Sequence, residues 1–237
     1  ILDTKKKRYL GLVGIWDIMI ALTFTQFNDD GTVLSQTVDN KAKYAIDASA
    51  FFAEHSKSIT MPVDGKTSLS SVIQHYAAGK HRALVTLGGP DKVGILSQTD
   101  VVRFLFKNKE KESKPWKSSL EDLKIVKATD VATMKNDQTA LQGFRLMALL
   151  SHNALCVVDA NKGTVCGTLS SSDLRGVNAT NLEDLILPVQ EFLKARGTVD
   201  KTAEGVVKMD ITLESAVQKM LSLKVHRLWV VTDDLKP

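Results

Sequence analysis

Three segments of this 237-residue chain share one spacing of glycine and aspartate. Each begins with a short apolar run closed by a polar residue at position 3, 86 or 159, and a glycine follows 8 residues later, at 11, 94 or 167. An aspartate follows 14 residues after the polar residue, at 17, 100 or 173, and opens a further apolar stretch. A spacing that recurs at long intervals indicates a chain built from repeats. Each repeat is predicted to contain a strand, a polar turn, a second strand and a helix.

A helix is also predicted before the strands of the later repeats. Apolar residues recur three and four positions apart over 69–76 and 213–221, after Thr67-Ser68 and Thr212 as helix caps. Gly79 is expected to end the first of these helices. The same pattern over 140–150 is looser, because Gly143 interrupts it. With a short extra strand in front, the complete unit reads strand, helix, strand, strand, helix.

Four copies of the unit fit the chain, and the outer two are incomplete. Repeat one is assigned to 1–25 and lacks its leading helix, and repeat two is assigned to 58–112. Repeat three, with a helical linker after it, covers 123–198, and repeat four covers 199–237. Because repeat four stops in the turn between its strands, we expect the sequence to belong to a longer polypeptide. The polar stretch 110–117 is predicted to be the linker between repeats two and three.

The repeat resembles the cystathionine-β-synthase (CBS) domain, which occurs in tandem pairs. Segments 94–102 (GILSQTDVV) and 167–174 (GTLSSSDL) carry this resemblance. The arrangement of four repeats further resembles the gamma regulatory subunit of AMP-activated and SNF1-related protein kinases, through 224–231 (KVHRLWVV), 80–82 (KHR) and the linker 181–184 (NLED). The resemblance implies an α+β fold in which four CBS repeats form two Bateman pairs, 1–112 and 123–237. These pairs are expected to pack as a pseudo-symmetric disc.

The resemblance also implies adenosine-nucleotide sites in the clefts between paired repeats. A ribose diol needs an acceptor for two hydroxyls, and an ionised aspartate at a helix start can supply it. Phosphates need cationic side chains, hydroxyls and the amides of helix N-termini. The repeats carry these residue types in order, and Thr129 matches a ligand-contacting threonine ahead of the third gamma repeat. The candidate nucleotide-binding residues are Asp17, Asp100, Asp173, Ser97, Thr99, Ser170, Ser172, Thr129, His81, Arg82, His152, His226 and Arg227.

Each candidate also has a purely structural interpretation. Aspartate, serine and threonine often only cap helices, and a His-Arg pair can be a solvated strand end. Repeat one has Gly14 and Trp16 where the other repeats have hydroxyls, so the indole is expected to block this pocket or to stack on a base. Asp100 is also a departure, because animal gamma subunits have a basic residue there. The chain therefore uses a different set of pockets, or belongs to a neighbouring four-repeat family that does not join a kinase.

Composition and motifs narrow the class of function. With 43% hydrophobic and 24% charged residues the chain is globular, and no apolar run approaches the ~18 residues of a membrane span. A net charge of +4 is weak evidence for nucleic acid, so neither nucleic acid nor membrane is expected as a partner. A metal-ligand cluster, a phosphate-binding glycine loop and a nucleophile elbow are all missing from the sequence. We therefore expect no catalytic activity, no metal and no cofactor besides the nucleotide ligand.

The leading hypothesis is a nucleotide-sensing regulatory subunit, located in the cytoplasm and/or the nucleus. It would bind AMP, ADP or ATP and regulate a protein kinase complex, with kinase catalytic and scaffold subunits as its partners. The first alternative is a CBS-repeat scaffold with degenerate pockets that acts through protein contacts, for example on a phosphatase or kinase. The second is the regulatory half of a larger enzyme or transporter.

Overall fold

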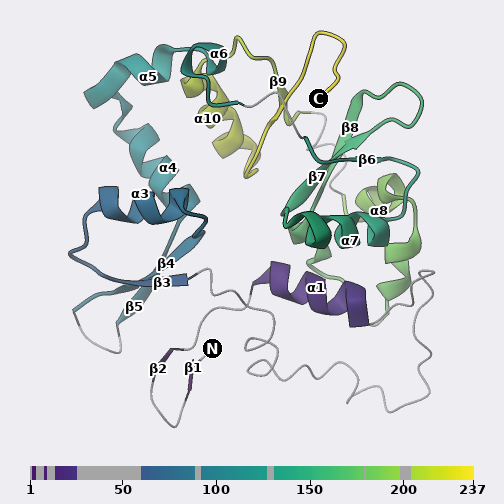
Figure 1. Ribbon diagram of the computed structural model, residues 1–237, viewed down its shortest axis with the longest axis horizontal. Coiled ribbons are helices and arrows are strands. Elements are labelled where there is room, and N and C mark those ends of the chain that lie inside the picture. Colours follow the sequence, from purple (N-terminus) through teal and green to yellow (C-terminus); the bar gives the residue numbers. More distant parts are fainter. Residues whose placement is uncertain are drawn as a thin grey trace. The chain divides into compact units, whose positions relative to one another are not determined.

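The computed structural model describes residues 2–3, 8–9, 14–25, 60–88, 92–126, 131–178, 180–197 and 204–237. The chain divides into two compact units, which are described separately. Unit 1 consists of Ile1–Gly14 and Val38–Lys111, and unit 2 of Ile15–Thr37 and Glu112–Pro237. The chain therefore enters unit 2 early, returns to unit 1, and enters unit 2 again after residue 111 (Figure 1).

Unit 1 contains the complete second repeat. A three-stranded sheet has the order β3-β4-β5, with β3 parallel and β5 antiparallel to the central β4, and β1 and β2 pair separately. Strand, helix, strand, strand and helix follow one another, which confirms the predicted unit. The elements are β1 (Leu2–Asp3), β2 (Arg8–Tyr9), β3 (Thr60–Asp64), α3 (Leu69–Ala77), β4 (Arg82–Thr86), β5 (Val93–Ser97) and α4 (Gln98–Lys107).

Helix α3 begins and ends where the sequence predicts. Ser68 accepts a hydrogen bond from the Ser71 N–H at 3.2 Å and caps the helix. Gly79 follows the helix with φ +88°, a conformation that glycine adopts without strain. Tyr76, on the buried face, donates its hydroxyl to the Leu96 carbonyl oxygen at 2.6 Å and so ties α3 to β5.

Unit 2 contains repeats three and four together with helix α1. One sheet has the order β6-β7-β8, and the short strands β9 and β10 pair in parallel. The elements are α1 (Ile15–Thr25), α5 (Ser113–Lys117), α6 (Leu120–Leu123), β6 (Thr133–Lys135), α7 (Ala140–Leu150), β7 (Ala154–Val158), β8 (Val165–Ser170), η2 (Ser171–Leu174), η3 (Leu182–Ile186), α8 (Val189–Ala195), β9 (Val206–Val207), α10 (Leu213–Leu223) and β10 (Trp229–Val230). Among the described helices of either unit, none is both long and apolar enough to cross a membrane.

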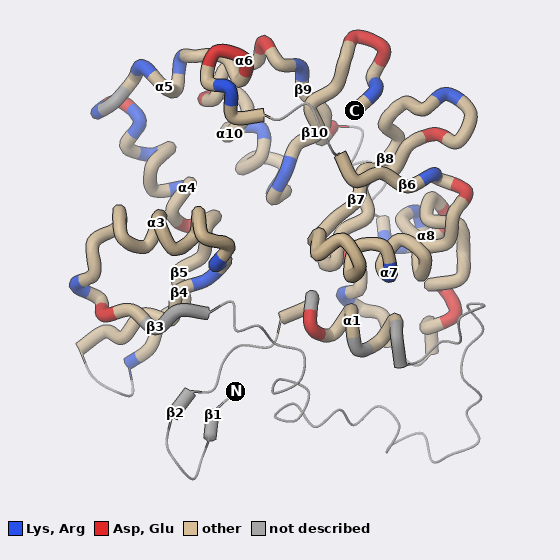
Figure 2. The backbone as a smooth tube through the Cα atoms, viewed as in Figure 1, with Lys and Arg blue, Asp and Glu red and all other residues tan. Residues whose placement is uncertain are grey.

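One sequence expectation needs correction. The helix expected after Asp173 is only the 3-10 turn η2, because Arg175 is extended (φ −62°, ψ 126°) and Gly176 takes φ +84°. The stretch 110–117, which is predicted to link repeats two and three, is helical over η1 (Lys109–Glu112) and α5. Its lysines are visible as blue segments along the tube near α5 in Figure 2. Helix α5 packs against α10 of repeat four.

Repeats three and four are joined by hydrogen bonds. The Trp229 indole N–H donates to Thr168 Oγ1 at 2.7 Å, which links β10 to β8. The Val165 N–H donates to the Leu235 carbonyl oxygen at 2.9 Å, in the turn after β10. The N-termini of α6 and α10 also exchange backbone hydrogen bonds, which satisfy amides that a helix start leaves free. These bonds fix the two repeats relative to each other.

Helix α1 of repeat one is part of the unit 2 core. It packs against α7 and against η2, and Met19 is completely buried there. The Arg145 Nε–H of α7 donates to the Thr23 carbonyl oxygen of α1 at 3.2 Å. Phe144 and Phe192 meet edge to face, with ring centroids 5.8 Å apart, in the same core. The pairing of the repeats as 1–112 and 123–237, and their packing as a disc, stay predictions.

Gly143 explains why the helical pattern over 140–150 is interrupted. A Cβ at this position would lie 2.4 Å from Leu169 Cδ2 and 2.7 Å from Met134 Sδ. Glycine therefore allows α7 to approach β8 and β6 more closely than any other residue would.

Gly143→Ala is expected to destabilise the protein by about 1 kcal/mol. Overpacking a core costs about 1–3 kcal/mol, and the better helix propensity of alanine returns about 1 kcal/mol. Urea unfolding measures the difference. Gly94→Ala is the control, because a Cβ there meets only Leu87 Cδ1, at 3.7 Å. A Gly143→Ala protein as stable as the wild type would contradict this explanation.

Candidate functional site

The turn after β8 holds Asp173 in a capping arrangement with one carboxylate oxygen unused. The Ser170 N–H donates to Asp173 Oδ2 at 2.7 Å, and Ser170 Oγ accepts from the Ser172 N–H at 3.4 Å. The hydroxyls of Ser170 and Ser172 lie 3.0 Å apart. Within the described ranges, Asp173 Oδ1 receives no hydrogen bond. The cap therefore leaves an acceptor for a further donor, such as a hydroxyl.

The charge state of Asp173 is set by two opposing effects. Burial raises the pKa of this carboxyl to about 6, because the ionised form loses its hydration. The hydrogen bond from Ser170 and three positive charges lower the pKa and offset part of this rise. These charges are on Arg227, Arg175 and Arg196. We call Asp173 with these three arginines the Asp173 cluster.

Arg227 reaches this cluster from repeat four. Its side chain is half-buried, and across the described residues its guanidinium makes no hydrogen bond or ion pair. Burial lowers the pKa of Arg227, and the charge of Asp173 raises it. The guanidinium nevertheless stays protonated, because its pKa starts far above neutrality. A half-buried guanidinium whose hydrogen bonds are unmade favours an anionic ligand.

Arg196 is a member of the cluster that the sequence analysis missed. Its side chain is only 13% exposed, and Nη2 lies 3.2 Å from Asp184 Oδ2. Its Nε is buried and has no hydrogen-bond partner in the described part of the chain. The guanidinium also lies over the Phe192 ring, 5.2 Å from its centroid. Arg196 follows the linker helix α8, outside the repeated pattern, so no spacing marks it in the sequence.

Asp100 occupies the equivalent turn of repeat two but has different partners. Ser97 donates to its Oδ2 through the hydroxyl at 2.6 Å and the backbone N–H at 3.0 Å. Arg103 lies 3.3 Å from its Oδ1, and the Asp100 side chain is 44% exposed. The hydrogen bonds from Ser97, first from its hydroxyl and then from its backbone, lower the pKa of Asp100. Both oxygens are therefore engaged, and Thr99 beside them is half-buried and also has a partner.

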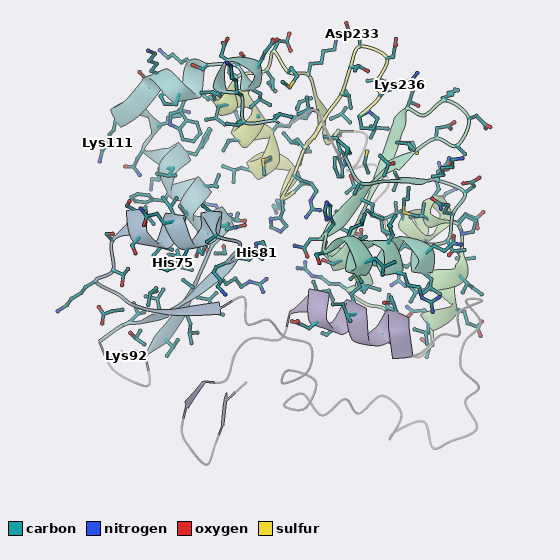
Figure 3. All side chains as sticks on the ribbon, viewed as in Figure 1. His75, His81, Lys92, Lys111, Asp233 and Lys236 are labelled. Carbon is teal, nitrogen blue, oxygen red and sulfur yellow. The ribbon has the colours of Figure 1, made fainter. Side chains whose placement is uncertain are left out.

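The histidines are less buried than the arginine of repeat four. His81 and Arg82 are both exposed, and Figure 3 shows His81 at the start of β4. His226 is exposed whereas Arg227 is half-buried, and both lie before β10, not within it as the sequence predicts. His152 is exposed, and its Nδ1 lies 2.6 Å from the Leu150 carbonyl oxygen, so the ring hydrogen-bonds its own turn when Nδ1 is protonated.

The candidates of repeat one are placed in part. Asp17 is the third residue of α1 and is only 5% exposed, in a helix that packs against η2. Asp17 also has an interaction partner. The side chain of Trp16 and the whole of Thr129 lie outside the described residues. The structure thus brings Asp173, Ser170, Ser172 and Arg227 to one place, with Arg196 added.

No family model matches the chain. Its structure is similar to that of protein MJ1225 of Methanocaldococcus jannaschii, which has been proposed as an archaeal homologue of g-AMPK. That similarity has a TM-score of 0.68 at 14% sequence identity and covers 99% of this chain and 81% of the archaeal chain. The fold is thus the CBS-domain fold that the repeat predicts.

Two curated relatives extend the comparison. The SNF1-related protein kinase regulatory subunit gamma-like PV42a of Arabidopsis thaliana is 24% identical over 259 residues, covering 95% of this chain and 71% of that protein. Protein SDS23 of Yarrowia lipolytica is 29% identical over 191 residues, covering 75% of this chain but only 37% of that protein. The resemblance to CBS proteins of the gamma type is therefore confirmed. The chain spans little more than a third of the length of Protein SDS23.

Proposed function

We propose that this chain is a regulatory module that binds an adenosine nucleotide where repeats three and four meet. In this proposal, Asp173 Oδ1 accepts the ribose hydroxyls, and Arg227 and Arg196 bind phosphate. The observation that carries the proposal is the pairing of an unused carboxylate oxygen with a half-buried guanidinium that makes no hydrogen bond to a described residue. The two groups are close enough for each to shift the pKa of the other.

The energetics favour a ligand that carries both hydroxyl and phosphate groups. A buried guanidinium N–H without a partner costs free energy, and a phosphate oxygen satisfies it with a charge-assisted hydrogen bond. The Nε of Arg196 is in this position within the described chain, and the half-buried guanidinium of Arg227 makes no hydrogen bond to a described residue. A neutral ligand would leave both guanidinium groups unsatisfied, so an anionic ligand fits this cluster better.

Calorimetric titration with AMP, ADP, ATP and S-adenosylmethionine in parallel tests the proposal. We expect AMP, ADP and ATP to bind, and their binding at one site to require Arg227. S-adenosylmethionine, which has no phosphate, should bind more weakly. If no nucleotide gives a heat of binding, and none competes with another ligand, nucleotide binding is refuted. The scaffold with degenerate pockets would then be the better interpretation.

We further propose that bound nucleotide regulates a protein kinase complex in the cytoplasm and/or nucleus, and that the chain itself is not an enzyme. The similarity to the gamma-like protein PV42a over 95% of the chain supports this proposal. Regulation requires that the nucleotide binds two states of the complex unequally. Co-purification with kinase catalytic and scaffold subunits, followed by kinase assays with and without AMP, tests it. A chain that joins no kinase subunit would contradict this part alone.

A further inference from the structure

The residue two positions after the repeat aspartate is apolar in repeats one and two and cationic in repeat three. It is Met19 in repeat one, completely buried, and Val102 in repeat two, half-buried within α4. In repeat three it is Arg175, which is exposed. Repeat three therefore places a cation where the other two repeats place an apolar packing residue.

The backbone explains why this position is exposed in repeat three. Helices α1 and α4 continue beyond their aspartates, whereas η2 ends at Leu174 and Arg175 is extended. Gly176 then takes φ +84° and turns the chain. A Cβ at Gly176 would lie 3.7 Å from Arg196 Nη1, so this turn also lies against the second guanidinium of the cluster.

The three arginines of the Asp173 cluster differ in their exposure to solvent. Arg196 is 13% exposed in its side chain, Arg227 is half-buried and Arg175 is exposed. Arg196 is held by Asp184, whereas the guanidinium of Arg175 makes no hydrogen bond or ion pair with any described residue. The charge of Arg175 acts on Asp173, whose Oδ2 accepts from Ser170. Arg175 is thus the unpaired cation at the outer side of the cluster.

We infer that Arg175 is a specificity-determining residue that binds the outer phosphates, so that this site prefers ATP and ADP to AMP. The inference rests on the proposed nucleotide site. A nucleotide whose ribose lies on Asp173 and whose first phosphate lies on the more buried arginines extends its later phosphates toward solvent. Arg175 is the exposed cation of the Asp173 cluster. Each added phosphate brings negative charge closer to it, whereas a monophosphate gains little.

Titration of wild type and Arg175→Gln with AMP, ADP and ATP tests the inference. We expect the substitution to weaken ATP binding about fivefold, ADP binding less, and AMP binding by less than about twofold, since exposed ion pairs contribute up to about 1 kcal/mol. Arg175→Lys should restore most of the ATP affinity. The preference of the wild type for ATP over AMP should diminish at high salt, because the Arg175 guanidinium is exposed to solvent.

Lys162→Gln is the matched control. Lys162 is an exposed cation in the turn between β7 and β8, at the opposite end of β8 from Asp173 and roughly 17 Å away along the strand. This variant should bind all three nucleotides like the wild type. Equal weakening of AMP and ATP by Arg175→Gln, or no weakening, would overturn the inference while leaving the proposed function intact. A wild-type chain that binds no nucleotide would overturn both.

Discussion

Asp173→Asn is expected to stabilise the protein at neutral pH and, at the same time, to weaken its binding of adenosine nucleotides. Burial raises the pKa of Asp173 to about 6, so the folded protein holds this proton more tightly than the unfolded chain does. The associated stability is fully present below about pH 4 and is lost as the pH rises through 6. Asparagine has no proton to lose and therefore avoids this loss.

At pH 7.5 the free energy of unfolding is expected to rise by about 1.5–3 kcal/mol. This range follows from about 1.4 kcal/mol per unit of pKa shift, reduced because the side chain is partly exposed. Urea unfolding of both proteins at pH 4.5 and 7.5 measures it, and the difference should shrink at the lower pH. Calorimetry should show adenosine-nucleotide affinity reduced by about 1.5–3 kcal/mol, the range for a lost hydrogen bond to a charged group.

Asp100→Asn is the matched control, because Asp100 holds the same position in repeat two. Hydrogen bonds from Ser97 lower the pKa of Asp100, so its contribution to stability is present at neutral pH and is lost as the pH falls. The two asparagine variants should therefore change stability in opposite directions at pH 7.5. A destabilised Asp173→Asn protein with unchanged nucleotide affinity would make Asp173 an ordinary helix cap.

Arg227→Gln is expected to weaken AMP and ATP binding by about 1.5–3 kcal/mol and adenosine binding far less. Only the phosphate contact is lost, because the ribose acceptor Asp173 remains in place. The loss should shrink at high salt, since the half-buried guanidinium is partly screened by ions. Calorimetry with adenosine, AMP and ATP at two salt concentrations provides the measurement.

Two controls distinguish a role of Arg227 in binding from a role in folding: the urea midpoint of the variant and a second substitution that keeps the charge. The guanidinium of Arg227 makes no hydrogen bond or ion pair with described residues, so its removal should not lower the urea midpoint of the free protein. Arg227→Lys, which keeps the charge, should retain part of the phosphate affinity. Equal losses for adenosine, AMP and ATP would mean that Arg227 supports the fold and does not bind phosphate.

The order of elements in the repeat could be predicted from the sequence, because the spacing of glycine, aspartate and apolar residues follows from the backbone geometry of strands, turns and helices. The order of strand, helix, strand, strand and helix is confirmed in repeat two, and Ser68 and Gly79 bound α3 as expected. The length of the element after Asp173 was predicted wrongly, because Gly176 ends it through a positive φ that an apolar pattern does not reveal. Gly143 weakened the prediction of α7, although close packing against Leu169 requires it.

The candidate site was predictable only in part. Asp100 and Asp173 are equivalent in the sequence. Only the three-dimensional environment shows that Asp100 has both carboxylate oxygens engaged, whereas Asp173 has one oxygen unused and a pKa raised by burial. Arg227 was expected to be better placed than His226, and it is the more buried of the two. Arg196 could not be found, since it comes from the linker after repeat three, outside the repeated spacing.

The position of α1 has a consequence for how the protein is made. The residues joined by the hydrogen bond from Arg145 to Thr23 are 122 positions apart, and Met19 fills a place in a core whose other members come after residue 131. Contacts between such distant positions form slowly, because a long stretch of chain must first be brought together. A nascent chain therefore carries α1 without its packing partners until α7 and η2 have left the ribosome. During that interval the apolar face of α1 is open to chaperones, and substitutions there should affect yield in cells more than stability once folded.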